Sequence, residues 1–488
     1  MPHLDRVLFV SPEIPPWVKS GGLGDVTAAL PAALRASGID TRVLVPGYAA
    51  LLDALRDTVC VGEYAPYAAF PACRVLATEH GQTGPLFIVD CPAYFDRAGT
   101  AYQDASFHDW PDNHLRFGLF SRVAALIGSA ANQIGWHPEL IHCNDWPTGL
   151  APAYQRLMQR RVPCVMAIHN LSHQGIFPAG VRDALGIPAW MYDINGLEYY
   201  GQLSFLKSGL FYADRLVTVS PSYAREIQTD EGGQGLGGLL RGRTRELVGI
   251  LNGIDSSAWS PATDPYIAHT YDFATIARKS VNKIALQRKL DLELGEERMV
   301  LGVVSRLAYQ KGIDWLVEIV PALMELPVEL AVLGSGEKPL EREIAALVSR
   351  YPGRVGATIG FDEPLAHLIE AGADAFVMPS RYEPCGLNQM YSLRYGTPPI
   401  VRATGGLADT VVDCNDETLR EGSANGFSYV AASAQALLAT IVRAIDTWKR
   451  PPHWRALQKR GMADDFSWSA SAQRYISLYN AVLEHTNP

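Results

Sequence analysis

The sequence predicts an α/β protein built from two Rossmann-like domains, each with a parallel sheet between layers of helices. Three observations support this. The 488 residues exceed the roughly 250–300 that one hydrophobic core organises. Short β-branched runs alternate with helical patterns, which is typical of βαβ units. The alternation restarts after a turn-rich break at Asn252–Asp255, so a domain boundary is expected near residue 250.

The predicted strands divide between the two halves. A helix from about Leu23 to Ser37, ended by Gly38, separates the first two strands. A last helix is expected from about Ala470 to Glu484. In the first half we expect strands at Arg6–Ser11, Thr41–Val45, Leu86–Asp90, Leu140–Asn144, Cys164–His169 and Leu216–Ser220. In the second half we expect them at Met299–Val304, Glu329–Leu333, Val355–Gly360, Ala375–Pro379 and Pro399–Val401.

Composition narrows the class of protein. Hydrophobic residues make up 48% of the chain and charged residues 19%, which is ordinary for a globular protein. The apolar stretch Val7–Val10 is too short for a signal peptide, so a cytoplasmic location is expected. The seven cysteines form no C-x-x-C pair, which favours reduced thiols. A net charge of −9 without a basic run argues against nucleic acid or anionic membranes as partners.

In open α/β sheets, ligands bind beyond the carboxyl ends of the strands, so the loops after predicted strands were compared. The first such loop carries Lys19 and the pair Gly21 and Gly22. Adjacent glycines let backbone N–H groups approach an anion at the following helix. The alternative is a plain glycine-rich turn with a solvated lysine, since the loop matches neither common phosphate-binding pattern. The position after the first strand favours a function.

Three loops of the second half could bind a nucleotide sugar. Arg306 and Lys311 flank a strand-to-helix turn and could hold a diphosphate, although a solvated turn explains them equally well. Glu383 could accept hydroxyl groups, or it could simply stabilise a helix N-terminus. The third loop repeats a Gly-Gly-Leu sequence and contains Thr404, Gly405 and Gly406.

Polar residues also end two strands of the first half. Asp145 follows one strand, and His169 and Asn170 end the next. A lone histidine at a strand end is more often structural than catalytic, but two polar strand ends together favour a site. The segment Asp112–Phe117 is more simply interpreted as the start of a helix. The sequence contains no nucleophile elbow and no credible metal-binding cluster.

These motifs together resemble a known family. The stretch Lys19–Val26 is similar to the K-x-G-G-L signature of bacterial glycogen synthases and plant starch synthases. Further matches run in order along nearly the whole chain, so the resemblance is specific even where single motifs are weak. They are His142–Leu150, Ile168–Gly175, Asn252–Asp255, Ser305–Gly312, Pro379–Gln389, Thr404–Val411 and Asp465–Trp468.

The resemblance implies a GT-B fold, in which two Rossmann-like domains face each other across a deep cleft. The acceptor-side domain would span residues 1–250 and be completed by the C-terminal helix at about 470–488. The nucleotide-sugar-binding domain would span 251–469. The implied activity is retaining transfer of glucose from ADP-glucose to the non-reducing end of an α-1,4-glucan such as glycogen, without a metal or other cofactor.

The resemblance also implies roles for individual residues. Lys19, Arg306 and Lys311 would bind the donor phosphates, and Glu383 and its loop would bind the donor glucose. The implied catalytic residues are Glu383, His169, Lys311 and Arg306. The implied substrate-binding residues are Lys19, Gly21, Gly22, Asp145, Asn170, Asn252, Phe361, Cys385, Gly386, Leu387, Thr404, Gly405 and Gly406. Because these ligands are split between the domains, closure is also expected, about a hinge where the chain crosses between domains, at Asn252–Asp255 and again before the final helix.

Two positions depart from wider patterns. Many related transferases carry a second glutamate eight positions after the first, where this chain has Tyr391. Phe361 stands where some members have a tyrosine near the donor base. The open alternatives are a transferase of the same fold that uses UDP-glucose or a smaller acceptor, and an inactive glucan-binding protein. A phosphorylase is disfavoured because no pyridoxal-phosphate lysine motif is present.

Overall fold

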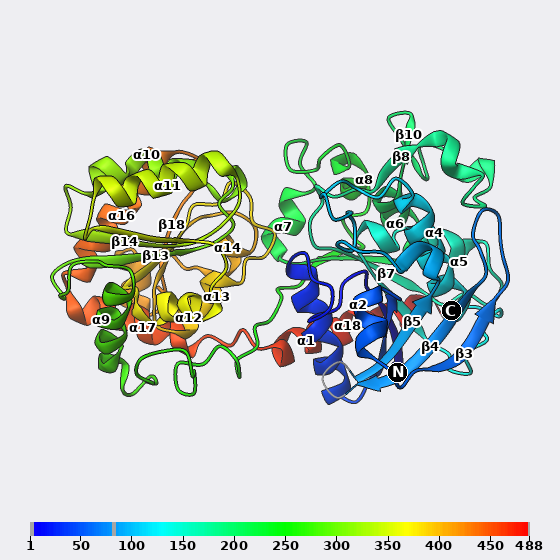
Figure 1. The fold of residues 1–488 in the computed structure, drawn as a ribbon, viewed down its shortest axis with the longest axis horizontal. Helices are drawn as coiled ribbons and strands as arrows, with labels where there is room; N and C mark the ends of the chain where they lie inside the picture. The colour runs from blue at the N-terminus through cyan, green and yellow to red at the C-terminus, as the bar shows by residue number, and fades with distance from the viewer. Residues whose placement is uncertain (1–3, 81–83, 487–488) are drawn as a thin grey trace. The chain divides into compact units, whose positions relative to one another are not determined.

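The computed structural model describes residues 4–80 and 84–486. The chain divides into two compact units. Unit 1 comprises Met1–Leu251 together with Trp468–Pro488, and unit 2 comprises Asn252–Ser467. The chain enters and leaves unit 2 through adjacent segments, because the Ile254 N–H donates to the Phe466 carbonyl at 2.8 Å. Each unit is an α/β structure around its own sheet (Figure 1).

Unit 1 is built on a nine-stranded sheet in the order β12-β11-β7-β6-β1-β2-β5-β4-β3. The strands are β1 (Arg6–Val10), β2 (Asp40–Pro46), β3 (Val59–Tyr64), β4 (Cys73–His80), β5 (Gly84–Asp90), β6 (Leu140–Asn144), β7 (Cys164–Ile168), β11 (Arg215–Thr218) and β12 (Leu247–Gly249). A small separate sheet contains β8 (Ile176–Pro178), β9 (Glu198–Tyr199) and β10 (Gln202–Ser204).

The expectation of a wholly parallel sheet is wrong at one edge of unit 1. Strand β4 runs antiparallel to both β3 and β5, and the three lie side by side in Figure 1. The physical reason is the length of the connections. Returning a strand in the parallel direction takes a crossover of about a dozen residues or more, and the segments joining β3, β4 and β5 are shorter than that.

Helices flank the sheet of unit 1 and complete its core. They are α1 (Gly22–Ala36), α2 (Ala49–Ala54), α3 (Pro92–Phe95), α4 (Asn113–Ile127), α5 (Ala151–Arg156), α6 (Phe205–Tyr212), α7 (Pro221–Glu226), α8 (Gly237–Gly242) and α18 (Trp468–Thr486). In α1 the apolar residues Leu23, Val26, Leu30 and Leu34 recur at helical spacing and are all buried, as an amphipathic helix against a sheet requires.

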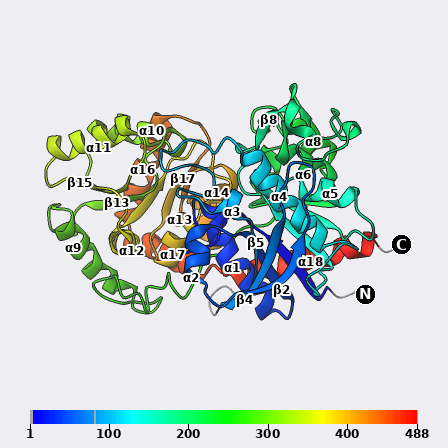
Figure 2. The ribbon, with the colours of Figure 1, turned by 45° about the vertical axis from the view of Figure 1, so that its right-hand side comes forward.

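The C-terminal helix α18 packs into unit 1, although more than two hundred residues separate it from Leu251. It lies beside α1 in Figures 1 and 2. The Tyr479 hydroxyl lies 2.9 Å from Nδ1 of His142 on β6. The His142 ring stacks on Phe9, with ring centroids 4.8 Å apart. Burial lowers the pKa of His142 to about 3, so this histidine is a neutral part of the core.

Unit 2 is built on a parallel sheet in the order β15-β14-β13-β16-β17-β18, as the sequence predicts. The strands are β13 (Met299–Val304), β14 (Val328–Gly334), β15 (Val355–Ile359), β16 (Ala375–Met378), β17 (Pro399–Arg402) and β18 (Phe427–Tyr429). The helices are α9 (Lys279–Lys289), α10 (Ile313–Leu323), α11 (Lys338–Arg350), α12 (Glu363–Gly372), α13 (Asn388–Arg394), α14 (Gly405–Thr410), α15 (Asp416–Glu421), α16 (Ala434–Trp448) and α17 (Pro451–Ala463).

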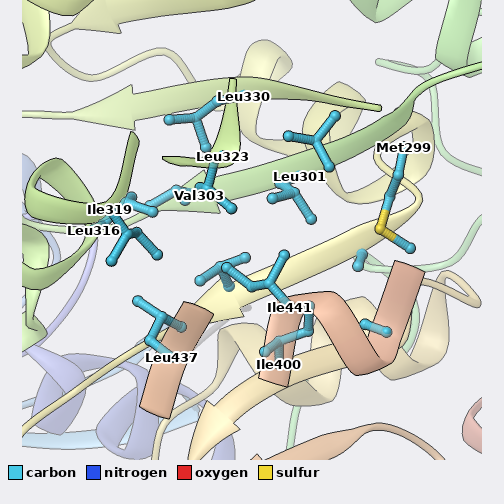
Figure 3. Packing of buried hydrophobic residues seen from close by; sticks show 14 of the residues in the cluster. Met299, Leu301, Val303, Leu316, Ile319, Leu323, Leu330, Ile400, Leu437 and Ile441 are labelled. Atoms are coloured by element: carbon cyan, nitrogen blue, oxygen red, sulfur yellow. The ribbon is translucent and has the colours of Figure 1, made fainter. Parts of the chain in front are cut away.

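The core of unit 2 forms on the two faces of this sheet. One cluster joins β13 to α10 and α16, and Figure 3 shows side chains such as Leu301, Ile319 and Ile441 turned toward one another. A second cluster joins the other face to α9 and α12, with Val300, Leu286 and Ile369 among its members. Among the described residues, no helix is long and apolar enough to cross a membrane.

The neutral state of His142 predicts a pH dependence of stability. An unfolded histidine has a pKa of about 6.5, whereas the pKa of His142 in the fold is about 3. As pH falls below about 6.5, His142 binds a proton in the unfolded chain but not in the folded chain. Stability is therefore lost between about pH 6.5 and 3, by roughly 1.4 kcal/mol per pH unit for this group.

The prediction can be isolated with His142→Phe, which keeps the stacking on Phe9 but cannot be protonated. Urea unfolding at pH 7, 6 and 5, followed by pulsed hydrogen exchange of peptides from β6, measures the free energy of unfolding. In His142→Phe this free energy should fall less steeply with decreasing pH than in the wild type. His137→Phe, at an exposed position, is the control and should keep the wild-type slope. Equal slopes in wild type and His142→Phe would contradict this account of the core.

Candidate active site

The loops after β13 and β16 meet at the point where the sheet of unit 2 reverses its strand order. Strand β13 pairs with β14 on one side and with β16 on the other. The chain continues from β13 to β14, so the loop after β13 and the loop after β16 lead away in opposite directions. Such a switch point leaves a crevice at the carboxyl ends of the strands, where ligands of open α/β sheets bind.

Two charged side chains meet across these loops. The Lys311 Nζ lies 2.5 Å from Oε2 of Glu383. Glu383 is buried, with 6% of its surface exposed, and its Oε2 also accepts a hydrogen bond from the Ser380 hydroxyl at 3.0 Å. A buried carboxylate of this kind requires a paired cation. The pair presents an ammonium group for a phosphate and a carboxylate for a sugar hydroxyl at one place.

Arg306 lies on the same turn as Lys311 but not against Glu383. Its Nη2 donates to Oε1 of Gln310 at 2.9 Å, and the residue is exposed. The guanidinium is therefore free to reach an anion outside the turn at little cost in desolvation. The structure thus joins Lys311 to Glu383 and leaves Arg306 as a nearby exposed cation.

The loop after Glu383 is held by buried polar groups. The fully buried side chain of Gln389 donates from Nε2 to the carbonyl oxygens of Cys385 and Gly386 at 3.1 and 3.0 Å. Gly386 adopts a φ of +74°, a conformation that favours glycine. Burial raises the pKa of the Cys385 thiol to about 12, against a smaller opposing effect of a hydrogen bond from the Asn252 backbone. Cys385 is therefore a neutral thiol beside Asn252.

The two Gly-Gly-Leu sequences have different surroundings. A Cβ on Gly405, whose φ is +46°, would lie 2.0 Å from the Glu383 carbonyl oxygen, and one on Gly406 would lie 2.0 Å from that of Cys385. Because they lack a Cβ, these two glycines let the backbone after β17 and at the start of α14 pack directly against the Glu383 loop. In contrast, a Cβ on Gly21 or Gly22 would meet no atom within 4 Å. The space above that first pair is open to a ligand.

In unit 1 the glycine loop after β1 is organised by a residue that sequence reasoning missed. The buried carboxylate of Glu13 accepts hydrogen bonds at Oε2 from the N–H groups of Ser20 and Gly21, at 2.9 and 3.3 Å. Its Oε1 accepts from the Tyr102 hydroxyl at 2.9 Å. Burial is the largest influence on Glu13 and raises the pKa of its carboxyl group. Lys19 is exposed and pairs with Asp25 at 2.6 Å.

Asp145 and His169 follow the adjacent strands β6 and β7 and contact each other. The His169 backbone N–H donates to Oδ1 of Asp145 at 2.8 Å. Burial nevertheless raises the pKa of Asp145 to about 7. Asp145 also has a φ of +53°, which costs energy in a residue other than glycine. Strain and a raised pKa at a strand end are common features of functional sites.

The hydrogen bonds of His169 indicate which of its ring nitrogens carries the proton. Asn144 donates from Nδ2 to the Val10 carbonyl at 2.8 Å, so its Oδ1 accepts. That oxygen lies 2.8 Å from Nε2 of His169, which therefore holds the proton. Burial lowers the pKa of His169 to about 4. The ring is neutral near pH 7, and its Nδ1 is a buried acceptor without a protein partner.

The remaining predicted residues follow strands of the two sheets, except Asn252, which is the first residue of unit 2. Phe361 follows β15 with 89% of its surface exposed, whereas Thr404 is buried beside Gly405. Asn170 follows β7, and its Oδ1 accepts from the backbone and hydroxyl of Ser172. The buried side-chain oxygen of Asn252 has no partner in the protein. Leu387 precedes α13 and closes the Glu383 loop.

Comparison with known proteins defines the class. Residues 6–242 match the family described as starch synthase catalytic domain, and residues 287–460 match the family described as glycosyl transferases group 1. The structure superposes on sucrose-phosphate synthase from Thermosynechococcus elongatus with a TM-score of 0.60 and 20% identity, over 99% of this chain and 100% of that one. Together with the polar and charged residues that follow the strands of unit 1 and unit 2, these matches define a glycosyltransferase of the GT-B fold.

Nearer relatives define the family. The chain is 52% identical to the glycogen synthase of Dechloromonas aromatica over 98% of each chain. It is 48% identical to that of Nitrosospira multiformis over 99% of this chain and 98% of the relative. It superposes on the catalytic domain of Arabidopsis thaliana starch synthase IV bound to ADP and acarbose, with a TM-score of 0.86, 30% identity and coverage of 99% and 100%. The chain belongs to the glycogen synthase family.

The different surroundings of the glycine pairs lead to a prediction. Gly405→Ala forces a Cβ into the Glu383 carbonyl and should lower both the thermal unfolding temperature and the turnover number. Gly22→Ala meets no protein atom and should leave the unfolding temperature within about one degree, because open surface substitutions change stability little. Thermal unfolding and glucosyl-transfer assays of both variants make the comparison. A Gly405→Ala variant with wild-type stability and turnover would contradict the packing role.

Proposed function

We propose that this chain extends an α-1,4-glucan such as glycogen by transferring glucose from ADP-glucose to its non-reducing end, with retention of configuration. The observation that carries the proposal is the Lys311–Glu383 pair at the sheet switch point of a chain in the glycogen synthase family. Binding of ADP and acarbose by the starch synthase IV domain supports a nucleotide donor and a glucan acceptor. We place the reaction in the cytoplasm, where the free cysteines would stay reduced.

The proposed roles follow from charge and position. Breaking the bond between glucose and ADP places negative charge on the diphosphate, which Lys311 and Arg306 would neutralise. The glucosyl group gains oxocarbenium character, so the carboxylate of Glu383 stabilises it best in the transition state. The loop Cys385–Leu387 would surround the glucose, and Phe361 offers an exposed ring for the base. We assign Glu383 an electrostatic and hydroxyl-binding role, not that of a covalent nucleophile.

The strand ends of unit 1 supply further proposed contacts. The neutral His169 can accept a hydrogen bond from a sugar hydroxyl at Nδ1, the buried atom that lacks a protein partner. Asp145 is proposed on the acceptor side. Lys19 would be a further ligand of the donor phosphates, beside the open space over Gly21 and Gly22. Neither nucleic acid nor a membrane is proposed as a partner.

The choice of donor is the first test. We expect glucosyl transfer to glycogen with ADP-glucose, at a kcat/KM at least about tenfold above that with UDP-glucose, because loss of a specific substrate contact typically costs about tenfold or more. Transfer of radiolabelled glucose to glycogen measures both donors, and Glu383→Gln controls for contaminating activity. Equal use of UDP-glucose would contradict the donor assignment, and absence of transfer from either donor would contradict the proposed activity.

The different roles proposed for Glu383 and Lys19 predict that their variants change different kinetic constants. Glu383→Gln keeps the shape of the side chain but removes its charge, and should lower kcat by about 10²–10³-fold, as loss of transition-state electrostatics does. Lys19→Ala should raise the KM for ADP-glucose roughly tenfold or more, since a hydrogen bond to a charged group is worth about 1.5–3 kcal/mol.

A matched control breaks an ion pair elsewhere in unit 2. Glu293 pairs with Arg298 at the surface, and Glu293→Gln should leave both constants unchanged. Initial rates over a range of donor and glycogen concentrations separate the effects. A Lys19→Ala variant that changes only the glycogen constant would refute its donor role. Trapping of a glucosyl ester on Glu383 would refute the electrostatic role of that carboxylate.

A further inference from the structure

Arg381 joins the two loops that carry the Lys311–Glu383 pair. It lies after β16, two residues before Glu383, and its partner Asp314 lies in the first turn of α10, three residues after Lys311. The Arg381 Nη1 donates to Oδ1 of Asp314 at 2.6 Å, and its Nη2 donates to Oδ2 at 2.7 Å. Two parallel charge-assisted hydrogen bonds of this kind fix direction as well as distance.

Two aromatic rings lie close to the same guanidinium group. The Arg381 Cζ lies 3.4 Å from the centroid of the Tyr309 ring and 3.9 Å from that of Trp315. Its Nη1 also donates to the Tyr309 carbonyl at 2.6 Å, and only 17% of its side chain is exposed. The two-point contact with Asp314 needs the planar fork of an arginine, which a lysine ammonium does not provide.

The backbone around Arg381 is fixed as well. Its N–H donates to the Gln310 carbonyl at 2.8 Å, next to Lys311 in the chain. Arg402, at the end of β17, donates from Nε to the Ser380 carbonyl at 2.9 Å and from Nη2 to the carbonyl of Arg381. The loop that carries Glu383 is therefore held on one side by β17 and on the other by the Arg381–Asp314 link.

We propose that Arg381 is a positioning residue for glucosyl transfer, which sets the alignment of Lys311 with Glu383 by clamping their loops together. The inference rests on the proposed function of this site and adds a residue that acts through that pair. Lys311 and Glu383 lie on loops from different strands, so their separation depends on how the loops are joined. A displacement of about 1 Å in a reacting group can lower a rate by about a hundredfold.

The conservative variant Arg381→Lys tests the clamp. It keeps the positive charge and loses the fork, so we expect kcat to fall about ten- to a hundredfold while the KM for ADP-glucose changes less than about threefold. The matched control is Arg443→Lys, which alters another arginine–aspartate pair of unit 2, with Asp413. This control should keep the wild-type kcat. A wild-type kcat in Arg381→Lys would overturn the proposal.

A double-mutant cycle separates positioning from a general structural effect. Once Glu383→Gln has removed the pair, Arg381→Lys should change the residual kcat by less than about threefold, because coupled residues show non-additive effects. Multiplication of the two single effects would show that Arg381 acts independently of the pair and would overturn the proposal.

A third measurement does not depend on turnover. Acetic anhydride labelling of Lys311, quantified by mass spectrometry, reports how closely its ammonium group is held by Glu383. Labelling should rise severalfold in Arg381→Lys and stay at the wild-type level in Arg443→Lys. Unchanged labelling would overturn the clamp even in an active enzyme. If Arg381→Lys raised the labelling but the wild-type chain transferred no glucose, the result would support the clamp and contradict the proposed function.

Discussion

The ion pair between Lys311 and Glu383 is the interaction on which the site of unit 2 depends. Glu383 is almost entirely buried, and removing the partner of a buried charge typically costs about 3–5 kcal/mol. Because Lys311 retains some exposure, the cost here lies toward the lower end of that range. The pair spans the loops after β13 and β16, which leave neighbouring strands at the switch point of the sheet. The topology of the sheet thus brings an ammonium group and a carboxylate side by side.

Close backbone approach at the strand ends serves the same arrangement. A Cβ on Gly312 would lie 2.1 Å from the Pro379 carbonyl oxygen, and one on Gly334 would lie 1.9 Å from that of Ser305. Together with Gly405 and Gly406, these glycines let the loops around Glu383 stack without side chains between them. The glycines of unit 2 therefore position the loops through packing, whereas Gly21 and Gly22 in unit 1 border open space.

Regular elements with strong apolar patterns were predictable from the sequence. The structure contains every strand that the sequence predicts, with ends within two residues of the predicted ones. These strands could be predicted because buried runs of β-branched residues are typical of central parallel strands. The sequence did not predict the edge strands β3 and β4 or the short strands β8, β9, β10, β12 and β18. The short strands have only two or three residues, too few to show an apolar pattern. In β3 one residue of six is buried, and a bulge between Cys60 and Gly62 interrupts its alternation. The expectation of parallel sheets failed at that edge because connection length, not strand composition, decides direction.

The site was predictable as a set of loops but not as a set of contacts. Lys311 and Glu383 could be named from their places after strands, yet their pairing joins residues 72 positions apart. Glu13 was missed because its hydroxyl partner, Tyr102, lies 89 positions away. The pattern after β17 shows a second Gly-Gly-Leu sequence, but it does not show that Gly405 and Gly406 lie against the backbone of the Glu383 loop. Which partner a polar group meets is a tertiary property, and a single sequence carries little record of it.

We propose that the loops after β13 and β16 form the donor site, with the Lys311–Glu383 pair at its centre. The most direct test is a crystal structure of the full chain with ADP. The account predicts diphosphate oxygens within hydrogen-bonding distance of Lys311 Nζ and the Arg306 guanidinium, with Glu383 still beside Lys311. A diphosphate bound elsewhere on the chain, with these two cations making no contact to it, would contradict the account.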